Sequence, residues 1–277
     1  MTNINLKENT LSLHGKPSNV RVIKIAENIK FRVCNTCLPQ KHSNFWDKFQ
    51  KGEWEPWTIK IISKELPPKT TFIDLGAWIG DTSLLASSNP NCEFVIAIDP
   101  DPKAINYFEE NLKINNDLSK KIELLNIAIT KKIGNVFISP CDKDKPFGNS
   151  SSKIYNKKLY DRPSHKVKSK KLLDLYDEYN LSKKNVFIKI DIEGGEEDLI
   201  YSIMELLNNK ETKTPIILME VHFFWFKYFE KGINNIIKLL KKYKNIMIDE
   251  MEFKNLEEIK KYFIKNKKGT VRLFLRN

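Results

Sequence analysis

Short apolar runs alternate with segments of helical periodicity through most of the chain. A strand buried on both faces is apolar at nearly every position, so the runs predict strands inside a sheet. Between them, apolar residues recur three or four positions apart, as in amphipathic helices. The runs that predict strands are 71–75, 93–98, 122–129, 135–139, 186–190, 216–221, 246–249 and 271–275. The segments that predict helices are 81–88, 102–115, 172–179, 196–207, 233–242 and 256–264.

Strands that alternate with helices predict an α/β domain, in which helices cover both faces of a mostly parallel sheet. This pattern occupies residues 66–277. Residues 1–65 are expected to form a small N-terminal extension, with strands at 20–25 and 29–33 and helices at 45–51 and 57–65. The segment 142–169 is polar and rich in Ser, Lys and Asp, which predicts a long loop of functional importance.

The composition is typical of a globular protein without a membrane span. Of the 277 residues 41% are hydrophobic, and no apolar run approaches the roughly 18 residues needed to cross a bilayer. Residues 1–16 lack the apolar segment of a signal peptide, so we expect a cytoplasmic protein. Lys and Arg outnumber Asp and Glu by 47 to 35, a net charge of +12. That excess attracts anionic partners, nucleic acid included, although the lysines are spread along the chain.

Two of the four cysteines, Cys34 and Cys37, stand at the spacing of half a zinc site or of a redox pair. His42 could add a third zinc ligand, but no second pair of cysteines follows. A structural zinc ion needs four ligands. We therefore expect reduced thiols and no metal at this position.

The segment 72–80, FIDLGAWIG, predicts a strand, a tight turn and the start of a helix. In a doubly wound sheet, ligands bind where such turns follow the carboxyl ends of the strands. A dinucleotide site would need glycine at the position of Trp78, and the charge of Asp74 would repel a phosphate. The same charge suits S-adenosylmethionine, which carries an ammonium and a sulfonium group and no phosphate. The turn therefore predicts S-adenosylmethionine as the cofactor.

An acidic residue about 20 positions beyond such a turn commonly binds ribose hydroxyls. Asp99 occupies this position, at the end of the next predicted strand. Asp74 and Asp99 thus end adjacent strands, and together they predict a nucleoside-binding pocket.

Further polar side chains end the next two strands. Lys189, Asp191 and Glu193 share one face if the strand stays extended that far, and Glu220 and His222 share a face of the following strand. The carboxyl ends of parallel strands meet at one edge of a sheet, so we expect these groups beside the cofactor.

Methyl transfer from a sulfonium is an in-line displacement, and an alcohol needs a nearby base to act as its nucleophile. His222 is a suitable base near neutral pH. Asp191 could instead orient the hydroxyl or take its proton. Alternatively, Asp191, Glu193 and His222 could hold a divalent cation that acidifies the acceptor oxygen.

The motifs together resemble those of FkbM-type S-adenosylmethionine-dependent methyltransferases, in the order of that family. The matching pieces are 52–58 (GEWEPWT), 72–80 (FIDLGAWIG), 98–102 (IDPDP), 148–151 (GNSS), 188–196 (IKIDIEGGE) and 218–222 (LMEVH). IDIEG-x-E is the most specific piece, and the glycine turn alone identifies only the wider superfamily. The resemblance covers residues 45–275 and implies a class I methyltransferase fold. That fold has a Rossmann-like, seven-stranded sheet whose last strand is antiparallel.

The resemblance also implies roles for individual residues. The turn residues Asp74, Gly76, Ala77, Trp78 and Gly80 would line the methionine end of the cofactor, Asp99 and Pro100 its ribose, and Asn126 or Ala128 its adenine. Glu55 and Thr58 would close over the cofactor from the N-terminal side. The candidate catalytic group, Asp191, His222, Glu193 and Lys189, follows from the residues themselves and not from the resemblance.

Three functions fit these features. The first is an O-methyltransferase that acts on a sugar or glycoconjugate, with 148–152 as the acceptor wall and the aromatic residues of 222–226 stacked on a sugar. The second is a ribose 2′-O-methyltransferase of RNA, which the basic charge favours. Methylation of a base amine is disfavoured, because the Asn/Asp-Pro-Pro-aromatic motif is absent from the sequence. The third is a non-catalytic binding module that keeps the fold.

Overall fold

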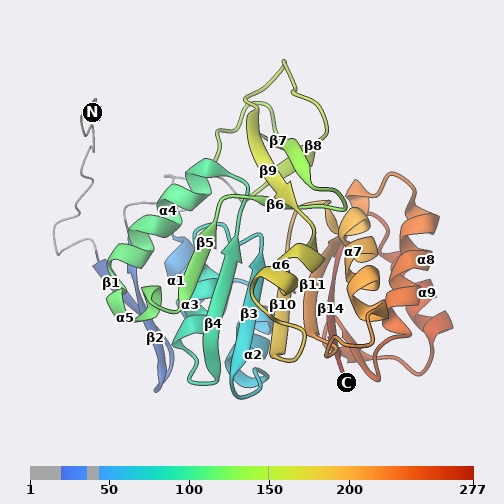
Figure 1. The fold of residues 1–277 in the computed structure, drawn as a ribbon, viewed down its shortest axis with the longest axis horizontal. Helices are drawn as coiled ribbons and strands as arrows, with labels where there is room; N and C mark the ends of the chain where they lie inside the picture. Colours follow the sequence, from blue (N-terminus) through green and yellow to red (C-terminus); the bar gives the residue numbers. More distant parts are fainter. Residues whose placement is uncertain (1–19, 36–43, 149) are drawn as a thin grey trace.

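The main sheet has the strand order that the class I methyltransferase fold requires. The structure is a computed structural model, and it describes residues 20–35, 44–148 and 150–277. The sheet runs β13-β12-β14-β11-β10-β3-β4-β5 (Figure 1). Its strands are β3 (Thr70–Leu75), β4 (Cys92–Ile98), β5 (Ile122–Leu125), β10 (Asn185–Ile190), β11 (Ile216–His222), β12 (Asn245–Ile248), β13 (Met251–Glu252) and β14 (Thr270–Arg276).

The chain winds outward from β3 through β4 to β5 and returns to β10 on the other side of β3, so the winding reverses between β3 and β10. These neighbours pair in parallel, whereas β14 lies antiparallel between β11 and β12. The predicted fold class is confirmed. The two-residue strand β13 is an eighth member of the described sheet, because the chain pairs back on β12 in a tight hairpin.

Helices cover both faces of the sheet. They are α1 (Phe45–Lys51), α2 (Pro56–Lys64), α3 (Asp81–Ser88), α4 (Pro102–Lys113), α5 (Asn116–Ser119), α6 (Leu172–Glu178), α7 (Glu196–Asn208), α8 (Phe229–Leu240) and α9 (Leu256–Lys265). Side chains from α6 to α9 share one buried cluster with the face of β3 that carries Ile73 and Leu75. Side chains from α1 to α4 share the other with Phe72. Successive residues of a strand point to opposite faces, so one apolar run serves two cores.

The described part of the N-terminal extension packs into the second of these cores. The hairpin of β1 (Val20–Ala26) and β2 (Ile29–Cys34) contributes Ile23 and Phe31 to it. The backbone N–H of Cys34 also donates to the side chain of Asn111 on α4, at 2.8 Å. The extension is thus joined to the main domain by packing and by hydrogen bonds.

A second, smaller sheet stands above the carboxyl ends of the main strands (Figure 1). It has the order β6-β9-β7-β8. Its strands are β6 (Ala128–Ile129), β7 (Gly134–Pro140), β8 (Ser152–Tyr155) and β9 (His165–Lys170).

Two predictions are corrected here. The run 122–129 is not one strand, because the chain leaves the main sheet after β5 and joins the small sheet at β6. The segment 142–169 is not only a loop, because β8 and most of β9 lie in it.

Cys34 takes part in a disulfide, so the expectation of reduced thiols is wrong for this residue. Cys37 and His42 lie outside the described residues. Cys92 and Cys141 carry free thiols. Within the described residues, no helix is both long and apolar enough to span a bilayer.

Candidate active site

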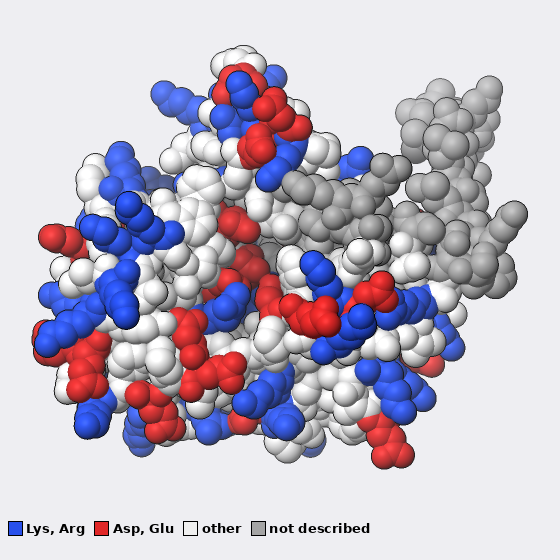
Figure 2. All heavy atoms as spheres, turned by 180° about the vertical axis from the view of Figure 1, so that it is seen from behind, with Lys and Arg blue, Asp and Glu red and all other residues white. Residues whose placement is uncertain are grey.

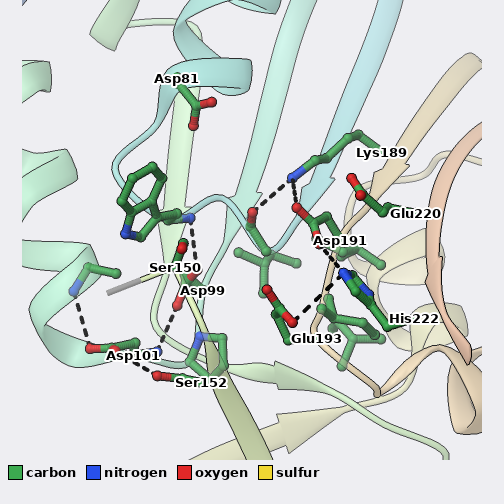
Figure 3. Close-up of a pocket in the computed structure, with 18 of the residues that line it drawn as sticks. Asp81, Asp99, Asp101, Ser150, Ser152, Lys189, Asp191, Glu193, Glu220 and His222 are labelled. Atoms are coloured by element: carbon green, nitrogen blue, oxygen red, sulfur yellow. Dashed lines mark hydrogen bonds and ion pairs between the residues drawn. The ribbon is translucent and has the colours of Figure 1, made fainter. Parts of the chain in front are cut away.

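A cavity of about 380 Å³ opens at the carboxyl ends of β3, β4, β10 and β11, beneath the small sheet. Its volume lies within the range of small-molecule sites. Figure 3 shows polar side chains from several elements turned toward it. The lining consists of Glu53, Trp54, Glu55, Leu75, Gly76, Trp78, Asp81, Ile98, Asp99, Pro100, Asp101, Ala104, Ile127, Ala128, Ile129, Ile138, Ser150, Ser152, Ile154, Lys189, Asp191, Ile192, Glu193, Glu220, His222 and Arg272.

The turn after β3 has no room for a side chain at either of its two glycines. Gly76 has a φ of 86°, and a Cβ atom there would lie 1.8 Å from the backbone oxygen of Asp191. Gly80 has a φ of 87°, and its Cβ would meet the ring of Phe108 at 2.2 Å. Both the left-handed backbone and the contacts therefore require glycine. The turn is held directly against the segment that follows β10.

Asp99, directly after β4, joins the glycine turn to the start of α4 by hydrogen bonds. Its carboxylate accepts hydrogen bonds from the backbone N–H groups of Trp78 and Asp101, each at 2.8 Å (Figure 3). Burial raises the pKa of Asp99 to about 7. The side chain of Asn126 donates to the backbone oxygen of Asp99 from behind, at 2.9 Å.

Asp101 joins helix α4 to the segment that bears the small sheet. One oxygen caps the helix by accepting from the N–H groups of Lys103 and Ala104. The other accepts from the N–H of Gly148 at 2.7 Å and from the hydroxyl of Ser152 at 3.2 Å. This carboxylate therefore fixes the polar wall of the cavity.

Asp74 and Lys189 form a buried pair. Asp74 is fully buried and accepts from the hydroxyls of Thr82 and Ser83, both at 2.6 Å. The Nζ atom of Lys189 lies 3.5 Å from Oδ1 of Asp74 and 3.8 Å from Oδ2 of Asp191. Burial alone would lower the pKa of Lys189, but the charges of Asp74 and Asp191 outweigh it and raise the pKa. Lys189 is thus held as a cation.

His222 ends β11 and points at two carboxylates. Its Nδ1 atom lies 2.9 Å from Oε1 of Glu196, and its Nε2 atom lies 3.8 Å from both Asp191 and Glu193. Burial alone would lower the pKa of His222, but Glu196, Asp191 and Glu193 raise it to about 9. The three carboxylates therefore favour the cationic form of the ring.

Further acidic groups share the cavity. Burial, followed by the charges of Asp191 and Glu55, raises the pKa of Glu220 to about 8, although Arg272 donates to it at 3.0 Å. Burial raises the pKa of Asp81 to about 8 and also raises that of Glu55. Glu55, Asp191 and Glu220 offer ligand atoms within 4.8 Å of one another, as do Asp191, Glu193 and His222. Either group could hold a cation.

The cavity is acidic although the chain as a whole is basic. Its lining carries eight carboxyl groups, against two permanent cations and His222. Figure 2 shows acidic atoms in the hollow near the centre of one face, while Lys and Arg side chains are spread over the surrounding surface. Several of these carboxyls have raised pKa values, so a cationic ligand would stabilise their ionised forms.

Comparison with protein families gives a match over residues 12–262 to the family described as the Vibrio cholerae RfbT protein. The chain belongs to this family. No curated protein matches the chain.

Similar solved structures include an FkbM methyltransferase from Methylobacillus flagellatus KT, the type of enzyme that the motifs resemble. It is 14% identical with a TM-score of 0.46, over 87% of this chain and 56% of that one. The MTase domain of METTL16 is 14% identical with a TM-score of 0.42, over 80% and 65%. A precorrin-6y C5,15-methyltransferase from Geobacter metallireducens GS-15 is 12% identical with a TM-score of 0.38, over 79% of each chain. The chain thus spans less than two thirds of the first two, and these likenesses assign no role to any residue.

Most residues predicted for the site line this cavity of the RfbT family member. They are Glu55, Gly76, Trp78, Asp99, Pro100, Ala128, Lys189, Asp191, Glu193 and His222. Five others stand outside the lining. Asp74 is buried in β3, and Ala77 and Gly80 are buried within the turn. Asn126 supports Asp99, and Thr58 lines a small adjoining pocket with Glu55.

Sequence reasoning missed several residues of the lining. Asp81 begins α3 directly after the glycine turn, and Asp101 caps α4, so both read as ordinary helix starts. The sequence predicts Glu220 beside the cofactor, two positions before His222 on the same strand face, but assigns it no role of its own. Arg272 is on the last strand, opposite Glu220 in the antiparallel pair, and only the fold places it there.

Proposed function

We propose that this chain is an S-adenosylmethionine-dependent O-methyltransferase that acts on a hydroxyl of a sugar or glycoconjugate. The observation that carries the proposal is the combination of an acidic lining with an apolar wall in one cavity at the switch point of the sheet. Few cofactors are both cationic and free of phosphate while carrying an apolar base, and S-adenosylmethionine is one of them. The class I fold supports the same cofactor.

The cavity offers a distinct surface for each part of the cofactor. Ile98, Ile127 and Ala128 supply an apolar slot for adenine. Asp99 stands at the end of β4 for the ribose hydroxyls. Gly76 and Glu55 line the opposite part, where a carboxylate suits the ammonium group. The methyl group would then face Asp191 and His222.

Methyl transfer requires the acceptor oxygen, the methyl carbon and the sulfur to lie nearly in line. The oxygen would sit against Asp191, Glu193 and His222, which converge from two elements. As the O–CH3 bond forms and the S–CH3 bond breaks, the hydroxyl proton passes to a carboxylate of this group. The products are the methyl ether and S-adenosylhomocysteine. Lys189 would hold Asp191 in position.

A saccharide acceptor is supported by two aromatic residues next to His222 in the chain. Phe224 is half-exposed and its ring lies 5.7 Å from that of His222, edge to face. Trp225 packs beside Phe224 at 5.2 Å. An exposed aromatic ring beside His222, which itself faces two carboxylates, suits a neutral, hydroxyl-rich ligand. The acidic lining weighs against RNA, because phosphates would be repelled.

The test has two stages. Calorimetry should detect S-adenosylmethionine binding and no binding of NADH, whose pyrophosphate would meet the acidic wall. Purified chain and cofactor should then methylate members of a saccharide panel, with linkage analysis locating an O-methyl group, and should leave RNA unmodified. Asp191→Ala and His222→Ala should abolish turnover and keep cofactor affinity within about threefold. Absence of cofactor binding, or methylation of RNA alone, would overturn the proposal.

A further inference from the structure

Asp191, Glu193 and His222 present three ligand atoms to one point in the cavity. These atoms all lie within 4.8 Å of one another. They come from the turn after β10 and from the end of β11, two parallel strands that the fold holds side by side. Figure 3 shows the three side chains converging.

The separations suit an ion better than hydrogen bonds. Nε2 of His222 lies 3.8 Å from Oδ1 of Asp191 and 3.8 Å from Oε2 of Glu193. These distances are too long for hydrogen bonds. Ligands at about 2.1 Å from a shared ion lie about 3 to 3.5 Å apart, so the group would close only slightly around a cation.

Glu196 gives a second, independent indication. It is fully buried, and its Oε1 atom accepts from Nδ1 of His222 at 2.9 Å and from the N–H of Gly194 at 3.1 Å. This bond fixes the ring so that Nε2 faces the cavity. His222 itself is only 6% exposed. A carboxylate behind a histidine is the usual support of a metal-binding imidazole.

We propose that Asp191, Glu193 and His222 bind a divalent cation of the Mn²⁺ or Mg²⁺ class, whose open positions take the acceptor hydroxyl. Two carboxylates and one imidazole, with no cysteine among the ligands, match hard ions of this class. The inference rests on the proposed methyl transfer and extends it. The ion displaces the proton from Nε2 of His222, and, because both carboxylates are then ligands, the bound hydroxyl loses its proton to solvent instead of to a carboxylate. Its oxygen takes the methyl group, and the S–CH3 electron pair remains on S-adenosylhomocysteine.

Glu196 is a positioning residue in this arrangement, since it acts through His222. Glu197, its neighbour on α7, is the matched control, because its carboxylate lies outside the cluster and accepts a hydrogen bond from the backbone N–H of Lys227. Glu196→Gln and Glu197→Gln remove the same charge from adjacent positions. Only Glu196→Gln should weaken binding of the ion.

The test is Mn²⁺ binding to the full chain after treatment with a chelator, followed by electron paramagnetic resonance. We expect one Mn²⁺ per chain, with nitrogen coupling from an imidazole. His222→Gln should abolish that coupling, and Glu193→Gln should weaken binding at least tenfold. Glu196→Gln should weaken it about 10- to 100-fold, and Glu197→Gln should leave it unchanged. Circular dichroism verifies that each variant is folded.

Several results would overturn the ion site. One is that the folded chain does not bind Mn²⁺. Another is that it binds Mn²⁺ without nitrogen coupling, and a third is that the Glu196 and Glu197 variants weaken binding equally. Full methylation by the chelator-treated chain would also overturn it while leaving the proposed methyl transfer intact. Failure to bind S-adenosylmethionine would instead remove the proposed function, whatever the result with Mn²⁺.

Discussion

The Nζ atom of Lys189 lies 3.5 Å from the Oδ1 atom of Asp74, and both side chains are buried. The pair joins the ends of β3 and β10, the two strands between which the winding reverses. Asp74 therefore has a cation of its own beside it, together with the hydroxyls of Thr82 and Ser83. The acidic character of the cavity comes instead from the carboxyl groups in its lining.

Replacing Lys189 by Met should be strongly destabilising, because it leaves Asp74 charged, buried and without its cation. Loss of one partner of such a pair typically costs about 3 to 5 kcal/mol. Chemical denaturation would measure the change in the free energy of unfolding. Lys183→Met is the control, since Lys183 pairs with Glu211 in solvent and its loss should cost under about 1 kcal/mol. Equal costs for the two variants would contradict the role given to Lys189.

The raised pKa of Asp81 predicts how stability depends on pH. Burial raises this pKa to about 8, whereas the unfolded chain releases the proton near the ordinary value of about 4. Between these values the folded state binds more protons, so its stability falls as pH rises toward 8. The Asp81→Asn variant has no carboxyl group at this position, so its free energy of unfolding should fall less steeply with pH. The two slopes should differ by up to about 1.4 kcal/mol per pH unit. Thermal unfolding of both proteins from pH 5 to 8 is the measurement, and parallel curves would refute the prediction.

Asp101→Ala should lower both stability and cofactor affinity. The change removes the cap of α4 and also the bonds to Gly148 and Ser152. Asn255→Ala is the matched control, because Asn255 caps α9 and lies outside the cavity lining. Loss of the cap should cost each variant about 1 kcal/mol of stability, and Asp101→Ala should lose more because two further bonds are removed. Calorimetry should show weaker S-adenosylmethionine binding for Asp101→Ala alone, and an unchanged affinity would show that the wall does not depend on this residue.

Phe224→Ala should raise KM for a saccharide acceptor about tenfold and leave cofactor affinity unchanged. The ring is half-exposed and lies beside His222, where a stacked sugar would lose its apolar contact. Ile264→Ala, at an exposed position on α9, should change neither quantity. A loss of cofactor affinity on changing Phe224 would contradict the prediction, because it would place this ring beside the cofactor and not beside the acceptor.

Hydrophobic periodicity predicted the main sheet well, because its strands are buried on both faces and read as unbroken apolar runs. The run from Ile122 to Ile129 misled, because one polar residue, Asn126, does not reveal that the chain changes sheet between Leu125 and Ala128. The strand β9 was missed because its outward positions are lysines, while only Val167 and Ser169 are buried.

The residues of the candidate site were likewise predictable from the sequence only in part. The residues at strand ends, such as Asp99 and Asp191, follow from sequence order, since parallel strands bring their carboxyl ends together. Arg272 belongs to an antiparallel strand far along the chain, and only its pairing with Glu220 brings it to the cavity. The orientation of the His222 ring depends on its hydrogen bond to Glu196, which the sequence presents as the start of a helix.

The small sheet is inserted between β5 and α6 and meets the cavity through its inner residues, such as Ile138 and Ile154. Changes in the length of its turns would leave the pairing of the main strands untouched. Such changes would therefore reshape only the side of the cavity that the small sheet covers, while the strand ends that carry Asp99 and Asp191 kept their positions.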